Sequence, residues 1–198
     1  MYFIITIIGI NIIVYLLPYI VDFSNRFLSS NDAFLSMFYQ QNDLIMNGEW
    51  YRLFTSLFLH GNLTHIALNM LTLWQLKDPM SAMATGLLGF PNSYSGLNGL
   101  TFLLVYLSSG VGGNLLSMQF SNNPSLGASG AILGLLGYLA GYAIVSGNQM
   151  ILSNLAINIV LLAVVGFLVP NIDNYAHFGG FVTGLILFSI LYNFRSFI

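Results

Sequence analysis

The sequence contains no cysteine and very little charge. Its 198 residues include four Lys or Arg and six Asp or Glu, which is 5% of the chain, whereas a soluble domain carries roughly 25%. Hydrophobic residues make up 57% of the chain. There are too few charged residues to cover such a chain with a water-soluble surface, so the lipid bilayer is its expected surrounding.

The scarce residue types also exclude several classes of function. Without cysteine the chain can form no disulfide, no thiolate metal site and no cysteine nucleophile. The few basic residues do not gather into the positive stripe that a nucleic-acid backbone requires, so nucleic acid is not an expected partner.

Long uncharged runs predict the segments that cross the membrane. A helix of about 20 apolar residues spans a hydrocarbon layer of about 30 Å. The first run has no basic leader and no obvious cleavage site, so we interpret it as a retained span rather than a signal peptide. The chain is therefore predicted to be an all-α polytopic membrane protein with a single domain, residues 1–198, and six spans near 2–21, 58–76, 97–118, 126–145, 150–169 and 174–194.

Most of the charge lies between the first two predicted spans, over residues 22–52. There it is interleaved with aromatic side chains such as Phe34, Trp50 and Tyr51. This mixture is typical of a loop that rests at the membrane surface and includes short amphipathic turns. An even number of spans places both termini on one side, but the basic residues divide evenly between the two sides and do not predict which side that is.

The first of three notable polar motifs in the predicted spans is Gly127-Ala128-Ser129-Gly130, where a loop turns into the predicted fourth span. Backbone N–H groups at a helix start lack intrahelical partners and the helix dipole is positive there, so an anion formed at Ser129 would be stabilised. A serine at this place can equally be a helix cap or a small packing residue. The motif alone does not distinguish these interpretations.

Glycines recur at helical spacing in two of the predicted spans. Gly130 and Gly134 lie in the fourth span, and Gly180 and Gly184 share one face of the sixth span with His177. Small residues let two helices approach closely, so these two spans are predicted to pack against each other. A neutral imidazole at His177 could act as a general base, or it could simply form a hydrogen bond with a backbone carbonyl at the membrane interface.

His65 and Asn69 lie one turn apart on the same face of the predicted second span. Together with the backbone N–H of Ser129 they could form an oxyanion hole, with the backbone N–H of Gly127 as a weaker candidate. They make a poor zinc site, because no suitable carboxylate accompanies them, and they could instead join helices by hydrogen bonds. His60 is interpreted as an interfacial or loop-bonding residue outside the site.

The order of these motifs resembles the rhomboid family of intramembrane serine proteases along almost the whole chain. The matching stretches are Gly48-Glu49-Trp50-Tyr51-Arg52-Leu53-Phe54-Thr55, Phe58-Leu59-His60, His65 with Asn69, Gly127-Ala128-Ser129-Gly130, and Ala176-His177 with Gly180 and Gly184. The resemblance implies a six-helix rhomboid bundle in the cell membrane. The helices would surround a water-filled cavity that opens to the outer face.

By resemblance, Ser129 is the nucleophile, His177 the general base, and His65 and Asn69 the oxyanion donors. The implied substrates are single-span membrane proteins cut within their transmembrane segments, and no cofactor or metal is implied. The main alternative is a catalytically inactive relative that binds transmembrane segments without cutting them. A small transporter or channel is a further alternative, because buried polar residues can line a pathway. The sequence leaves the oligomeric state open.

Three positions qualify this resemblance. Leu133 stands where the family often has an aromatic residue stacked on the catalytic histidine, which implies a more loosely oriented His177. The connection over residues 77–98 lacks the family's usual glutamate. Asp173, four residues before His177, is predicted to cap the last helix rather than to complete a triad, because Asp is a favoured residue at a helix start.

Overall fold

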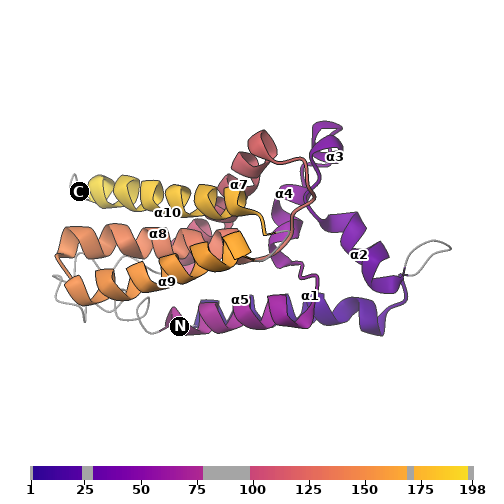
Figure 1. The fold of residues 1–198 in the computed structure, drawn as a ribbon, viewed down its shortest axis with the longest axis horizontal. Helices are drawn as coiled ribbons and strands as arrows, with labels where there is room; N and C mark the ends of the chain where they lie inside the picture. The colour runs from indigo at the N-terminus through magenta and orange to yellow at the C-terminus, as the bar shows by residue number, and fades with distance from the viewer. Residues whose placement is uncertain (1, 24–28, 78–98, 169–171, 196–198) are drawn as a thin grey trace.

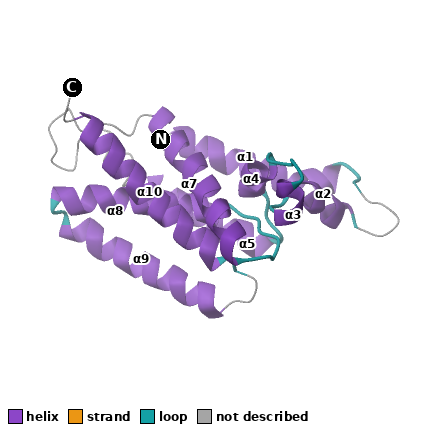
Figure 2. Ribbon diagram, turned by 90° about the horizontal axis from the view of Figure 1, so that it is seen from above, coloured by secondary structure: helices purple, strands orange, loops and turns teal. Residues whose placement is uncertain are grey.

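The computed structural model describes residues 2–23, 29–77, 99–168 and 172–195. These residues form helices joined by loops and turns (Figure 2). Within this part of the chain, four helices are long and apolar enough to cross a bilayer, namely α1 (Tyr2–Ile20), α7 (Gly99–Phe120), α8 (Ser129–Ser146) and α10 (Asn174–Arg195). Helix α9 (Gln149–Leu168) has a shorter apolar stretch, and α5 (Leu63–Gln75) has 13 residues. The chain is an all-helical, multi-pass membrane protein.

Two helices start later than predicted, and local backbone geometry explains both. The second span was predicted to begin at residue 58, but residues 56–58 form a 3-10 turn, and α5 begins only at Leu63, where the Asn62 side chain accepts a 2.9 Å hydrogen bond from the His65 backbone N–H. The fourth span was predicted to begin near residue 126, but Gly127 has φ +129°, a left-handed conformation that ends any helix there. Helices α1, α9 and α10 begin and end within one residue of the predicted bounds.

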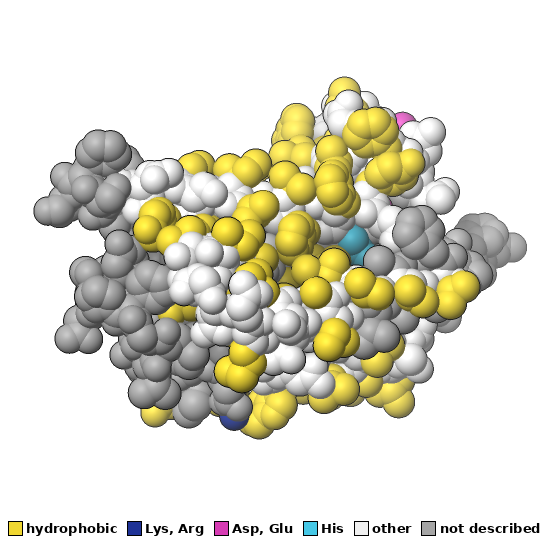
Figure 3. Space-filling view, turned by 60° about the vertical axis from the view of Figure 1, so that its left-hand side comes forward, with side chains coloured by type: hydrophobic (Ala, Val, Ile, Leu, Met, Phe, Trp, Pro, Cys, Tyr) yellow, Lys and Arg dark blue, Asp and Glu magenta, His cyan; other side chains and the backbone are white. Residues whose placement is uncertain are grey.

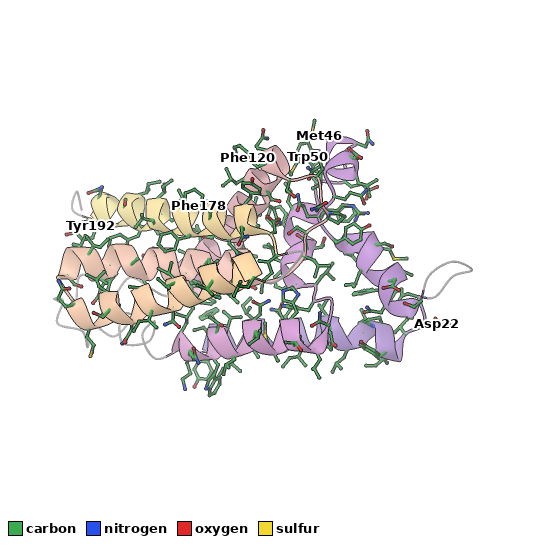
Figure 4. All side chains as sticks on the ribbon, viewed as in Figure 1. Asp22, Met46, Trp50, Phe120, Phe178 and Tyr192 are labelled. Atoms are coloured by element: carbon green, nitrogen blue, oxygen red, sulfur yellow. The ribbon has the colours of Figure 1, made fainter. Side chains whose placement is uncertain are left out.

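Short helices fill the connection between α1 and α5, namely α2 (Ser30–Phe38), α3 (Asn42–Met46), α4 (Arg52–Thr55) and the 3-10 turn η1 (Ser56–Phe58). Arg52 is buried and ties this segment together, because its guanidinium donates to the Glu49 carboxylate and to the carbonyl oxygens of Ser36 and Tyr39. Met46 and Trp50 are exposed and lie at the same end of the molecule (Figure 4). The predicted short turns are present as these helices, while their position at the membrane surface stays a prediction.

Helix α8 is the centre of the bundle. It buries 14 of its 18 residues. Almost all of the buried residues are apolar or glycine, so the sequence of the helix shows no polar face. In Figure 1, α8, α9 and α10 run side by side, while α1 and α5 form a separate layer. Helix α1 begins and α10 ends toward the same end of the bundle. A helix that is apolar on every face is expected inside a bundle or as a membrane span, and the extensive burial of α8 places it inside the bundle.

Glycines bring the backbones of α8 and α10 into direct contact. A Cβ added at Gly180 would overlap the backbone of Gly130, and a Cβ added at Gly184 would overlap the backbone of Gly134. On α7, Gly113 faces the Ala176 carbonyl oxygen in the same way. These contacts fix the start of α10 against the start of α8, which is where the two predicted reactive side chains lie.

Candidate active site

Ser129 and His177 connect the starts of α8 and α10. His177 Nε2 lies 2.7 Å from Ser129 Oγ, within hydrogen-bond distance, although the two residues are 48 positions apart in the chain. Each is placed by helix packing, because the glycine contacts below them set the separation of the two backbones. In this geometry a neutral imidazole can accept the serine proton.

Ser129 is the first residue of α8, and its side chain does not cap the helix. The N-cap position is Ala128, which forms no side-chain cap hydrogen bond. The helix ladder begins when Ile132 N–H donates to the Ala128 carbonyl oxygen at 2.9 Å, so the Ser129 N–H precedes the ladder. This end of α8 therefore offers an N–H group and a positive dipole end beside the hydroxyl.

Two of the predicted oxyanion donors lie on α5 and face the turn before Ser129. A Cβ added at Gly127 would lie 2.7 Å from His65 Nε2 and 3.8 Å from Asn69 Nδ2, so both nitrogens border this glycine. Two reasons require glycine at position 127. Its φ of +129° disfavours any side chain, and a methyl group would crowd His65.

The structure does not favour the backbone N–H of Gly127, which was the weaker oxyanion candidate. This N–H donates a 2.9 Å hydrogen bond to the Ser56 carbonyl oxygen and is therefore occupied. This bond links the turn before Ser129 to η1. The remaining candidate donors are the side chains of His65 and Asn69 and the backbone N–H of Ser129.

His60 was placed outside the site by sequence reasoning, but the structure brings it next to both side-chain donors. It is only 1% exposed, its Nε2 lies 3.0 Å from Asn69 Nδ2, and its ring contacts the His65 ring edge-on with centroids 4.9 Å apart. A continuous helix from residue 58, as predicted, would have put His60 on a different part of the helix surface from Asn69. The break between η1 and α5 turns it back toward Asn69.

Asp173 is a helix cap, as predicted. Its Oδ1 accepts a 2.9 Å hydrogen bond from the Ala176 N–H, and its Oδ2 accepts one from the Ser117 hydroxyl on α7. Its two carboxylate oxygens are therefore engaged by groups other than the His177 ring. The carboxylate fixes the start of α10 to α7, just before the turn that carries His177.

The outer face of the molecule beside the pair is largely apolar. Figure 3 shows histidine atoms at the surface between hydrophobic side chains, on a face with few charged groups. Phe178, beside His177, is 64% exposed, and Phe120 stacks on Tyr175 with ring centroids 5.3 Å apart. Leu133, the departure from the family's aromatic position, is buried in the core, and the 2.7 Å contact between His177 and Ser129 is present without an aromatic ring there. The other departure, residues 77–98, lies almost entirely outside the described residues.

Among the described residues, no group of three or more His, Asp or Glu side chains lies close enough together to hold a metal ion. The imidazoles of His60, His65 and His177 instead lie near amide, hydroxyl or ring partners.

The fold and the paired side chains define a class of polytopic helical membrane proteins with a serine and a histidine on adjoining helices. Residues 47–194 match the Rhomboid domain, so the chain belongs to the rhomboid family. It is 40% identical over 149 residues to "Rhomboid protease GluP" of Bacillus subtilis (strain 168), a match that covers 73% of this chain and 27% of that protein.

Plant relatives extend the comparison. The chain is 36% identical over 156 residues to "RHOMBOID-like protein 4" and 34% identical over 160 residues to "RHOMBOID-like protein 5", both of Arabidopsis thaliana. These matches cover 75% of this chain in each case, and 36% and 46% of the two plant proteins. The chain thus spans less than half the length of these three relatives.

Proposed function

We propose that this chain is an intramembrane serine endopeptidase that cleaves transmembrane segments of single-span membrane proteins. The observation that carries the proposal is the 2.7 Å approach of His177 Nε2 to Ser129 Oγ at the adjoining starts of two apolar helices. Membership of a family whose members include a named rhomboid protease supports it.

In the proposed reaction His177 accepts the hydroxyl proton of Ser129, and the serine oxygen attacks a peptide carbonyl of the substrate. His65, Asn69 and the Ser129 N–H donate hydrogen bonds to the oxyanion that develops. His177 then protonates the leaving amine, and water hydrolyses the acyl-enzyme by the same proton transfers in reverse order.

The membrane arrangement belongs to the same proposal. We expect one domain with six membrane-spanning helices, in which α5 and α9 join the four long apolar helices, and with the site open to the outer face. The common end at which α1 begins and α10 ends supports an even number of crossings. Substrate segments are expected to contain helix-weakening residues, because a helix engages its own carbonyl groups in hydrogen bonds.

The test is to incubate the detergent-purified chain with a model single-span substrate, beside its Ser129→Ala and His177→Ala variants. Each variant should lose cleavage while unfolding at a temperature close to that of the unchanged protein, because each removes a reactive group and little packing. A fluorophosphonate should label the unchanged protein and not Ser129→Ala. Cleavage close to the unchanged rate in either variant would overturn the proposal. Substrate binding without any cleavage would favour the inactive relative, and solute flux that survives Ser129→Ala would favour a transporter.

A further inference from the structure

His60 lies in the short extended connection between η1 and α5, and it is in contact with both side-chain donors of the proposed oxyanion hole. Its imidazole is buried, its Nε2 is 3.0 Å from Asn69 Nδ2, and its ring packs edge-on against His65. No role in proton transfer requires it, because Ser129 is paired with His177.

With the amide nitrogen of Asn69 toward His60, as in the structure, the chemistry of the two groups sets the direction of the hydrogen bond. The amide nitrogen of Asn69 is a donor only, so His60 Nε2 must accept, and the single proton of the neutral imidazole is then on Nδ1. The Asn69 amide carries two hydrogens. One is directed to His60, and the second remains for another acceptor.

The position of the amide shows where that second hydrogen is useful. Asn69 Nδ2 lies 3.8 Å from the place that a Cβ of Gly127 would occupy, and His65 Nε2 also borders that place. Gly127 is two residues before Ser129. If the amide rotated by half a turn, its Oδ1 would be presented there instead. An oxygen acceptor would repel a developing oxyanion, so the orientation of this amide decides whether Asn69 helps or hinders the reaction.

We propose that His60 is a positioning residue, which holds the Asn69 amide with its nitrogen toward the oxyanion through the hydrogen bond that Nε2 accepts. This inference rests on the proposed protease function. His60 does not touch the reacting atoms. It acts through Asn69, and its packing against His65 stabilises the second donor in the same place.

A double-mutant cycle tests the inference. His60→Leu, which keeps bulk but has no acceptor, should lower kcat about 10- to 100-fold, which is less than the 100- to 1,000-fold typical of a lost oxyanion donor. KM should change little. In an Asn69→Ala background the same His60→Leu change should have almost no further effect on kcat, because the group that His60 orients is gone. His60→Gln, whose side-chain oxygen can accept, should restore part of the rate.

The cycle separates positioning from plain destabilisation. Asn11→Leu removes another buried polar side chain, whose amide bonds its own helix α1 at the Ile7 carbonyl oxygen, and it should leave kcat unchanged in both backgrounds. The inference is wrong if His60→Leu leaves kcat unchanged, or if its full effect persists in the Asn69→Ala background.

A measurement on the unchanged protein covers the case in which the His60 variants do not fold. Nitrogen-15 NMR of labelled histidine should show His60 with a protonated Nδ1 and an unprotonated Nε2, its resonances being assigned by elimination with His65→Ala and His177→Ala. A protonated Nε2 overturns the inference. Absence of substrate cleavage by the unchanged protein would refute the protease function itself, and the NMR result would still decide whether His60 accepts from Asn69.

Discussion

The two sides of the proposed site are built in different ways. On one side, α8 and α10 meet through glycines with their backbones in contact, and the start of α10 is also fixed to α7 through Asp173 and Ser117. On the other side, α5 is a short helix whose Leu63, Leu68 and Leu71 are all more than half exposed. The proposed nucleophile and base thus lie on the closely packed side, and the proposed side-chain oxyanion donors lie on α5, the open side of the site.

A cavity accompanies the open side. It has a volume of about 100 Å³ and lies between α5, α8 and α9, with Thr72, Leu136 and Asn154 among its lining residues. Because fewer neighbours constrain α5, individual hydrogen bonds must place its donors, namely the Asn62 cap at its start and the His60 contact with Asn69. The same proposed site therefore depends on backbone packing for one half and on single polar contacts for the other.

The largest effect should follow removal of the proposed oxyanion donors on the open side. His65→Ala and Asn69→Ala are each expected to lower kcat about 100- to 1,000-fold, because each removes one hydrogen bond to the oxyanion. Leu68→Ala, an exposed position between them on α5, is the matched control and should stay near the unchanged rate. Steady-state cleavage with separate kcat and KM decides this, and a change confined to KM would show that the pair serves binding or helix contact instead.

A smaller effect, on stability, is expected on the closely packed side. Gly184→Ala should lower the free energy of unfolding by about 1 to 3 kcal/mol, because the added methyl group overlaps the Gly134 backbone. Gly9→Ala on α1 is the matched control, since nothing lies within 4 Å of its added Cβ and alanine favours a helix by up to about 1 kcal/mol. Thermal unfolding in detergent measures both. Equal effects of the two substitutions would contradict the close backbone contact of α8 and α10 at Gly184.

The closely packed side was the easier one to predict from the sequence. Glycine spacing on α8 and α10 is a property of a regular helix, so it predicts which faces can meet, and Asp173 at a helix start predicts a cap. The pairing of helices that carry Ser129 and His177 followed from those patterns.

The open side could not be predicted in the same way, because it depends on breaks in the helices. An uncharged run does not show that residues 56–58 form a 3-10 turn or that the chain is extended at Leu59, and these breaks bring His60 to Asn69. Likewise, no pattern indicated that the Gly127 N–H would be taken by the Ser56 carbonyl oxygen. Contacts between a loop and a helix require the three-dimensional path of the loop.

A still smaller effect is expected at the cap that joins α10 to α7. Asp173→Asn, which can still accept from the Ala176 N–H, should keep activity within about tenfold, whereas loss of a triad carboxylate costs about 10,000-fold. Asp173→Ala should lower the free energy of unfolding by about 0.5 to 2 kcal/mol, because the cap is lost. Cleavage rates and thermal unfolding of both variants measure this. A collapse in the Asp173→Asn rate at unchanged stability would establish a triad instead of a dyad.

The smallest effect concerns Glu49 in the surface connection, outside both sides of the site. The hydrogen bond from the Tyr51 hydroxyl, and then the one from Arg52, lower the pKa of the Glu49 carboxyl below its ordinary value of 4.5. A group whose pKa is lowered by folding stabilises the folded protein above its ordinary pKa, and this contribution is lost as the pH falls through the lowered pKa. Glu49→Gln should therefore give a flatter decline of unfolding temperature below pH 4.5 than the unchanged protein, with little difference in that slope near neutral pH. Because the carboxyl is solvent-exposed, the difference should shrink in high salt, and identical pH profiles at low salt would show that the Glu49 contacts do not contribute to folding.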